Sequence, residues 1–170
     1  MDDQKLSTVL MDESAKKNQD VIRRFAWEIA SISVHLEEIR HFWAKALGIS
    51  GPQWLMVVAL ADLDKGEGVP VNAVSKMLHV DPSFVTTQSK LLEKKGFLHR
   101  RTSTEDGRVV RMSVTDKTRR LLDELSPKRA RLKEIILAEF TEPELEEFTS
   151  KLSAMRDLLA RANLKSALEL

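Results

Sequence analysis

One predicted helix, residues 81–95, carries hydroxyl and amine groups on a single face. Val85, Ser89 and Leu92 recur at helical spacing and are predicted to point inward. The opposite face then carries Ser83, Thr86, Thr87 and Lys90. Hydroxyls near a helix N-terminus can donate to phosphate oxygens, and the free N–H groups of the first turn add an anion site. Alone, these side chains would be ordinary solvent-exposed residues, so the flanking elements decide the interpretation.

The segment that follows is rich in arginine and is predicted to form a hairpin. Its tip contains Asp106-Gly107-Arg108, and the residues that flank it are Arg100, Arg101 and Arg111. The Asp106 carboxylate can orient the Arg108 guanidinium for a narrow minor groove, while the flanking arginines meet phosphates. A surface ion pair, worth no more than about 1 kcal/mol, would explain the Asp–Arg pair but not the excess of arginine.

These residues need two helices and a hairpin to position them. Asn72 is predicted to cap a helix through Leu78, residues 79–80 form a turn, and Asp81 caps the next helix with Pro82 at its first position. Strands are predicted over 97–101 and 109–114, with a short edge strand over 69–71. This order is that of a winged helix-turn-helix, which binds double-stranded DNA.

A long amphipathic helix is predicted before this lobe, from an N-cap at Asp20 to Gly48. Its apolar stripe repeats in steps of three and four and consists of Ile22, Phe25, Ile29, Ile32, Leu36, Ile39, Trp43 and Leu47. Ser50, Pro52 and Gln53 predict the start of a second helix, which is apolar all round to Asp64 and therefore buried.

Two further helices are predicted after the lobe. Thr115 caps one that runs to about Phe140, and residues 141–144 form a capping box for the last. The last helix has the apolar stripe Leu145, Phe148, Leu152, Met155 and Leu159. The terminal helices have more apolar surface than a small domain can cover, which favours a homodimer. The alternative is packing within the chain against the buried helix over 53–64.

The predicted fold class is therefore mainly α, with an α+β winged-helix lobe between long dimerisation helices. The expected parts are an N-terminal arm over 1–19, a dimerisation helix over 20–51, the DNA-binding lobe over 52–115 and C-terminal dimerisation helices over 116–170. A chain of 170 residues is long enough for a small domain with helical extensions.

Charge is distributed unevenly, and the composition excludes several classes. Residues 71–120 contain 11 Lys or Arg against 5 Asp or Glu, a net of +6, so the chain's total of +1 leaves −5 elsewhere. Without cysteine there is no disulfide, thiolate metal site or thiol redox switch. No apolar run approaches the roughly 20 residues that span a bilayer, and the N-terminus does not resemble a secretory signal, so a cytoplasmic location and no membrane partner are expected.

The chain resembles the MarR family of bacterial winged-helix transcription regulators. The resemblance rests on Asp81-Pro82-Ser83-Phe84-Val85-Thr86, Leu92-Glu93-Lys94-Lys95-Gly96-Phe97, Arg100-Arg101, Asp106-Gly107-Arg108 and Val114-Thr115, and on the helix order over 20–163. It implies homodimers whose recognition helices enter successive major grooves of a pseudo-palindromic operator and whose wings touch the minor grooves. Its implied contacts are Ser83, Thr86, Thr87, Lys90 and Arg108, with Asp106 orienting the last. Members often carry a basic side chain where this sequence has Thr87 and Leu91.

The resemblance also implies release from DNA by a small, often aromatic or phenolic, acid. The candidate lining residues are His35, Ile39, Arg40, Trp43, Trp54 and Met56. Trp and Met offer an adaptable apolar wall, and Arg or His can pair with a carboxylate. The alternative for each of the large apolar residues is that it fills the core. The spacing of His35, Glu38 and His41 does not place all three on one narrow face, so no metal is expected.

The sequence favours one function over two others. The favoured one is a homodimeric, ligand-responsive repressor with sequence-specific DNA binding and no cofactor, associated with the nucleoid when it is bound to DNA. The alternative is a non-specific architectural or partner-binding winged-helix protein. An enzyme is not expected, because there is no Gly-rich phosphate loop, Ser/His/Asp set or pair of carboxylates in an apolar setting.

Overall fold

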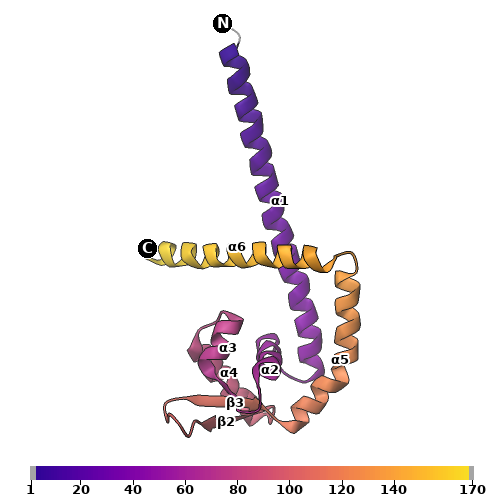
Figure 1. The fold of residues 1–170 in the computed structure, drawn as a ribbon, viewed down its shortest axis with the longest axis vertical. Coiled ribbons are helices and arrows are strands. Elements are labelled where there is room, and N and C mark those ends of the chain that lie inside the picture. The colour runs from indigo at the N-terminus through magenta and orange to yellow at the C-terminus, as the bar shows by residue number, and fades with distance from the viewer. Residues whose placement is uncertain (1–2, 169–170) are drawn as a thin grey trace. The chain divides into compact units, whose positions relative to one another are not determined.

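The computed structural model describes residues 3–168, and their side chains from 19 to 163. The chain divides into two units after Arg119. The elements are α1 (Asp3–Ala46), α2 (Gly51–Leu63), β1 (Val69–Pro70), α3 (Val71–Leu78), α4 (Pro82–Lys94), β2 (Leu98–Thr102), β3 (Val110–Val114), α5 (Asp116–Leu137) and α6 (Glu142–Leu168). The mainly helical fold with a small winged-helix sheet is as predicted (Figure 1).

Helix α1 is longer than the sequence pattern indicated. The predicted N-cap at Asp20 is wrong, since the helix begins at Asp3 and includes most of the segment 1–19, which was predicted as a loose arm or a short helix; residues 1–2 lie outside the described residues. Residues 3–19 contain no Gly or Pro to interrupt a helix. Asp20 instead pairs with Arg23, with Oδ1 and Nη2 2.6 Å apart. The helix ends where Gly48 takes a left-handed φ of 66°.

The apolar stripe of α1 is only partly covered. Ile22, Phe25, Ile32 and Leu36 are between 46% and 59% exposed, whereas Trp43 is buried. The Trp43 ring stacks on Trp54 of α2, with centroids 6.4 Å apart and planes at 24°. Packing against α2 therefore buries the C-terminal end of the apolar stripe. The N-terminal part of the stripe stays exposed and could pack against another surface.

Helix α2 is the central helix of the first unit. Ser50 caps it through the predicted capping box: Ser50 Oγ accepts from Gln53 N, and Gln53 Oε1 accepts from Ser50 N. Met56, Val57 and Leu60 are fully buried, as the apolar sequence predicted. Within the described residues no single helix is long and apolar enough to cross a membrane; residues 19–46 and α2 meet that test only as a pair bent by 82°.

The turn between α3 and α4 is held by polar groups. His79 ends α3 with a left-handed φ of 53°, and Ser75 Oγ donates to the Val80 carbonyl at 2.6 Å. The predicted cap at Asp81 is confirmed, since its Oδ1 accepts from Ser83 N at 2.7 Å. The predicted cap at Asn72 is wrong: α3 already begins at Val71, and its N-cap Pro70 makes no side-chain capping bond.

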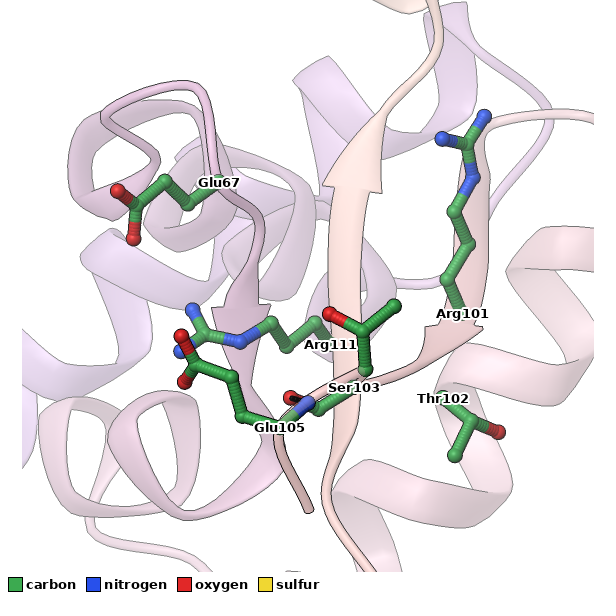
Figure 2. A pocket seen from close by; sticks show the side chains of 7 residues that line it. Glu67, Arg101, Thr102, Ser103, Glu105 and Arg111 are labelled. Carbon is green, nitrogen blue, oxygen red and sulfur yellow. Dashed lines mark hydrogen bonds between the residues drawn. The ribbon is translucent and has the colours of Figure 1, made fainter. Parts of the chain in front are cut away.

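Three antiparallel strands form the sheet in the order β1-β3-β2. The wing strands pair Leu98 with Val114 and Arg100 with Met112, and the predicted edge strand β1 pairs with β3. Leu98 and Met112 are fully buried, so one face of the hairpin packs on the core. Arg111 Nη1 donates to the Gly68 carbonyl at 3.0 Å, which ties the wing to the loop that carries Glu67 (Figure 2).

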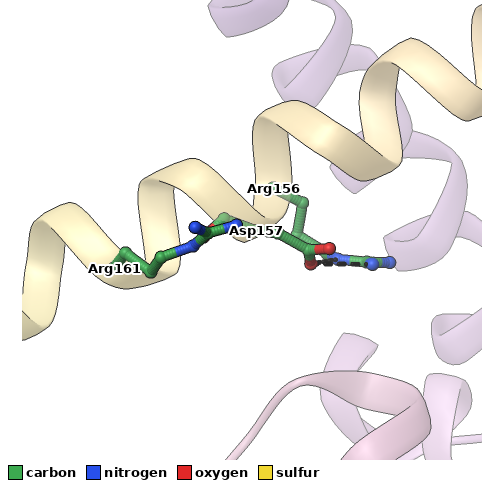
Figure 3. Close-up of polar contacts among 3 residues, drawn as sticks. All are labelled: Arg156, Asp157 and Arg161. Atoms are coloured by element: carbon green, nitrogen blue, oxygen red, sulfur yellow. Dashed lines mark hydrogen bonds and ion pairs between the residues drawn. The ribbon is translucent and has the colours of Figure 1, made fainter.

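Helix α5 begins in the first unit and continues into the second, which also contains α6. Thr115 caps α5 as predicted, but the helix ends at Leu137 rather than near Phe140. At α6, Glu144 accepts from both the Thr141 amide and the Thr141 hydroxyl, so the hydroxyl donates and only half of the predicted capping box forms. On α6, Asp157 accepts from the neighbouring Arg156 guanidinium and its carbonyl accepts from Arg161 (Figure 3).

Burial predicts a large loss of stability for one and almost none for the other of two adjacent leucines of α4. Leu92 is fully buried and Leu91 is 42% exposed. We expect Leu92→Ala to lower the free energy of unfolding by about 2–5 kcal/mol, because it leaves a cavity in the core. Leu91→Ala, the matched control, should change it by less than about 0.5 kcal/mol. Chemical denaturation followed by circular dichroism measures both values, and equal losses would contradict the assigned face of α4.

Candidate nucleic-acid interface

The two faces of α4 are arranged as the sequence predicted. Val85, Ser89 and Leu92 are fully buried. Ser83, Thr87 and Lys90 are exposed and Thr86 is half-buried. Ser89 Oγ donates to the Thr86 carbonyl at 3.0 Å, so this inward hydroxyl is satisfied within the helix. Thr86, Thr87 and Lys90 lie on the opposite side of α4, where a ligand could reach their hydroxyl and amine groups.

Asp81 places a negative charge at the start of this helix. Hydrogen bonds from Ser83, first through its side chain and then through its amide, lower the pKa of the Asp81 carboxyl group. The carboxylate thereby satisfies first-turn N–H groups that would otherwise face an anion. The remaining donors of the interface are the side chains further along α4.

Polar contacts shape the wing tip differently from the prediction. Asp106 Oδ1 accepts from the backbone N–H of Arg108 at 2.9 Å, and the described residues include no ion pair between the two side chains. Gly107 does not adopt a left-handed φ. The expectation that Asp106 holds the guanidinium is therefore wrong. Because an Asx turn satisfies the carboxylate locally, Asp106 fixes the backbone from which the Arg108 side chain extends.

Adjacent arginines of β2 lie on opposite faces of the hairpin. The Arg100 pair with Met112 lies on the core face, and the Arg101 pair with Arg111 lies on the outer face. Arg100 is half-buried and Arg101 is exposed. The two side chains were predicted to play the same role in meeting phosphates; strand alternation separates them.

A groove of about 590 Å³ lies between α4 and the wing. Its lining includes Thr86 of α4 together with Arg100, Arg108 and Arg111 of the wing, and its remaining residues are Pro70, Val71, Asn72, Pro82, Val109 and Val110. The structure thus brings the hydroxyl-bearing helix and the arginine-rich hairpin together around one groove. This arrangement suits a long polyanion that contacts both elements.

A second pocket, of about 310 Å³, lies beside the wing. It is lined by Glu67, Arg101, Thr102, Ser103, Thr104, Glu105 and Arg111 (Figure 2). Two carboxylates share it with two guanidiniums, so its charge is mixed. Its lining includes no side chain of α4, and Arg101 is therefore separate from the groove that holds Arg100 and Arg108.

The segment that contains most of the groove residues is similar to a known protein family. Residues 53–110 match the model of the MarR family. Residues 53–110 are a MarR-family domain. The resemblance predicted from the sequence is thus confirmed over this segment, and the family is one of transcription regulators rather than of enzymes.

Three relatives extend the similarity beyond the MarR-family segment. The chain is 25% identical over 138 residues to the HTH-type transcriptional repressor MdtR of Bacillus subtilis, covering 79% of this chain and 89% of the relative. The S. aureus MepR–DNA complex shares 17% identity and a TM-score of 0.66, over 78% of this chain and 96% of that one. The structure of a MarR-family transcriptional regulator from Listeria monocytogenes complexed with 26mer DNA has 20% sequence identity and a TM-score of 0.65. The match covers 79% of this chain and 88% of that one.

The candidate effector residues do not form one exposed set. Trp43, Trp54 and Met56 are buried in the core of the first unit, which favours their structural interpretation. His35 is exposed and pairs with Glu38, with Nδ1 and Oε2 3.2 Å apart. Ile39 and Arg40 are half-buried. Among the described residues no cluster of three His, Asp or Glu side chains is arranged to hold a metal ion.

Arg40 is the polar residue of this set with spare hydrogen-bonding capacity. Its guanidinium pairs with Glu37, but its Nε is buried and has no hydrogen-bond partner. A buried donor without a partner is uncommon in folded proteins. Of the predicted effector residues, Arg40 is therefore the one whose guanidinium has an unsatisfied donor.

The sequence did not predict two polar contacts that position α4 within the MarR-family segment. Gln53 Nε2 donates to Gln88 Oε1 at 3.0 Å, and Lys95 Nζ donates to the Gly48 carbonyl at 3.0 Å. Both partners are far apart in sequence, so helical spacing gives no signal for either bond. The polar residue Gln53 at the start of an apolar helix was a local sign, but capping alone was enough to explain it.

The lowered pKa of Asp81 predicts a pH dependence of the MarR-family helix-turn-helix. A carboxylate whose folded pKa is depressed stabilises the fold above its unfolded pKa, and this contribution is lost as the pH falls through the folded pKa. We expect the melting temperature of the wild type to fall relative to Asp81→Asn below about pH 4, since asparagine also caps but does not titrate. Thermal unfolding from pH 7 to 3 measures the difference; a constant offset would contradict the role of the carboxylate.

Proposed function

We propose that the chain is a homodimeric repressor that binds a pseudo-palindromic double-stranded DNA operator and is released by a small aromatic or phenolic acid. The observation that carries DNA binding is the groove where Thr86 of α4 meets Arg100 and Arg108 of the wing. A helix face of hydroxyls can read base edges in a major groove while an adjacent arginine hairpin reaches phosphates or the next minor groove.

Electrostatics and relatives support double-stranded DNA as the partner. Residues 71–120 carry a net charge of +6, which concentrates positive potential on the lobe that holds the groove. Two structures with the same fold, from S. aureus and Listeria monocytogenes, are complexes with DNA. We place the contacts at Ser83, Thr86, Thr87, Lys90, Arg100 and Arg108, with Asp106 supporting the wing tip and Arg101 and Arg111 toward the flanking backbone.

Homodimerisation is supported by the exposed stripe of α1. Ile22, Phe25, Ile32 and Leu36 repeat at the spacing of a helix–helix seam and remain exposed in the single chain. A second copy could cover them, and binding to successive major grooves would then require the two recognition helices to lie about 34 Å apart. Such a regulator is cytoplasmic and is associated with the nucleoid when bound to its operator.

Arg40 supports an anionic effector. Its partly satisfied guanidinium lies on α1 near the buried Trp43, so a carboxylate and an aromatic ring could be bound by neighbouring residues. The ligand would release DNA only by binding more tightly to a dimer in which the recognition helices are wrongly spaced for the operator.

The alternative is a non-specific architectural or partner-binding winged-helix protein. It uses the same basic surface but reads no sequence, since phosphate contacts alone carry no base information. The hydroxyl face of α4 at the groove favours the sequence-specific function, because it places side chains that can reach base edges beside the arginines.

Two substitutions in the groove distinguish these functions. We expect Thr86→Ala to lower affinity for a selected operator by roughly 1–3 kcal/mol while affinity for random duplex changes little. Arg108→Ala should weaken both and reduce the dependence of log K on log salt by about one unit if it contacts a phosphate. Fluorescence anisotropy at several salt concentrations measures both effects. Equal loss on every duplex for Thr86→Ala would favour the architectural alternative.

An effector titration tests the release mechanism. We expect a panel of benzoate- and phenol-type acids to contain a ligand that weakens operator binding, and Arg40→Gln to abolish that response because the guanidinium is lost. Anisotropy of labelled operator with increasing acid measures it, with Arg23→Gln, an exposed arginine on the same helix, as the control. Unchanged affinity with every acid would contradict release by this class of ligand.

A further inference from the structure

The end of α1 and the start of α2 form a junction that lies beside the recognition helix. Gly48 ends α1, and Ser50 and Gln53 form the capping box of α2. Gly51 lies so close to α1 that a Cβ there would be 2.9 Å from Glu37 Oε1. Because Glu37 pairs with Arg40, the position of the α1 side chains and the first turn of α2 are mutually constrained.

Two hydrogen bonds connect this junction to α4. Gln53, only 5% exposed, uses Oε1 for the capping box and Nε2 for Gln88 of α4. Lys95, at the other end of α4, donates to the Gly48 carbonyl. The junction therefore contacts the recognition helix near its middle and at its C-terminal end, which is enough to fix both its position and its axial rotation.

The Gln53–Gln88 bond is the more selective of the two. Lys95 is exposed, so water can replace its bond at little cost. Gln53 is buried, and an unpaired amide there would lose the hydrogen bonds it makes in water. The apolar side chains under α4 are compatible with small shifts of the helix, whereas this bond requires one arrangement of α4 on α2.

We propose that Gln53 is a positioning residue for DNA binding, which fixes the recognition helix to the α1–α2 junction through Gln88. The proposal rests on the proposed function, because it assigns Gln53 to the same DNA-binding surface without contact to DNA. Residues that face DNA from α4 lie on the side of the helix away from α2, so their alignment with base edges depends on this attachment. Movement at Glu37 and Arg40 would then reach the recognition helix through Gly51 and Gln53.

A double-mutant cycle isolates the bond from the capping box. In Gln53→Glu the carboxylate still accepts from Ser50 N, and the Gln88 amide can turn to donate to its second oxygen. In Gln88→Glu the new carboxylate accepts from Gln53 Nε2. Each single variant therefore keeps a donor and an acceptor. The double variant places two acceptors together without a donor, so the bond cannot form.

The measured quantity is a ratio of two affinities. The first is the affinity for a duplex that the wild type selects from a random pool, and the second is the affinity for random duplex. We expect each single variant to keep this ratio within about twofold, and the double variant to lower it roughly tenfold below the product of the singles. Each single variant carries one added negative charge. The product of the two single effects therefore already includes the general repulsion between these charges and DNA. Gln53→Glu with Gln88→Lys, which restores a donor, should recover the ratio.

Circular dichroism and thermal unfolding accompany every affinity measurement. If the double variant is unfolded at the assay temperature, Gln88→Leu replaces it, because that variant removes the partner and keeps the capping box; its ratio should fall about fivefold. A lower melting temperature with an unchanged ratio, additive single effects, or no recovery when Gln53→Glu and Gln88→Lys are combined in a folded protein would overturn the proposal. A wild type that selects no duplex would instead reject sequence-specific binding itself.

Discussion

The burial of one side of α4 is the constraint on which the DNA-binding surface depends. Val85, Ser89 and Leu92 are fully buried, and this decides which face of α4 points outward, while the Gln53–Gln88 bond limits smaller rotations of the helix. The residues that face outward, from Ser83 to Lys90, are therefore defined by the core and not by their own contacts. Ser89 is a polar group on the buried side, and its bond to the Thr86 carbonyl allows a hydroxyl to occupy an apolar site.

Local polar groups keep the remaining freedom of the lobe small. The left-handed His79 and the bond from Ser75 to Val80 set the angle between α3 and α4, while Arg111 joins the wing to Gly68. Thr118 Oγ1 donates to the Phe97 carbonyl at 2.7 Å and so fixes the first turn of α5 to the start of the wing. The helix-turn-helix and the wing are thereby held as parts of one unit.

The sequence was sufficient for features with local causes. The inward residues of α4, the caps at Ser50 and Asp81 and the position of the wing follow from periodicity and from short-range hydrogen bonding. The start of α1 was not predictable from Asp20, since a good capping residue inside a helix looks the same as one at its end. The Asp106 contact was misassigned because two groups, the amide and the guanidinium, compete for one carboxylate. Bonds such as Gln53–Gln88 join distant segments and have no periodic signal.

Strand β2 is an edge of the three-stranded sheet, with β3 on one side and no further strand of the described residues on the other. An open edge can pair with a strand of another molecule and begin aggregation, and natural proteins protect such edges with charge. The two neighbouring arginines of β2, residues 100 and 101, place that charge on both of its faces. The same side chains that are proposed to attract DNA would thus also disfavour pairing of this edge with a strand of another copy.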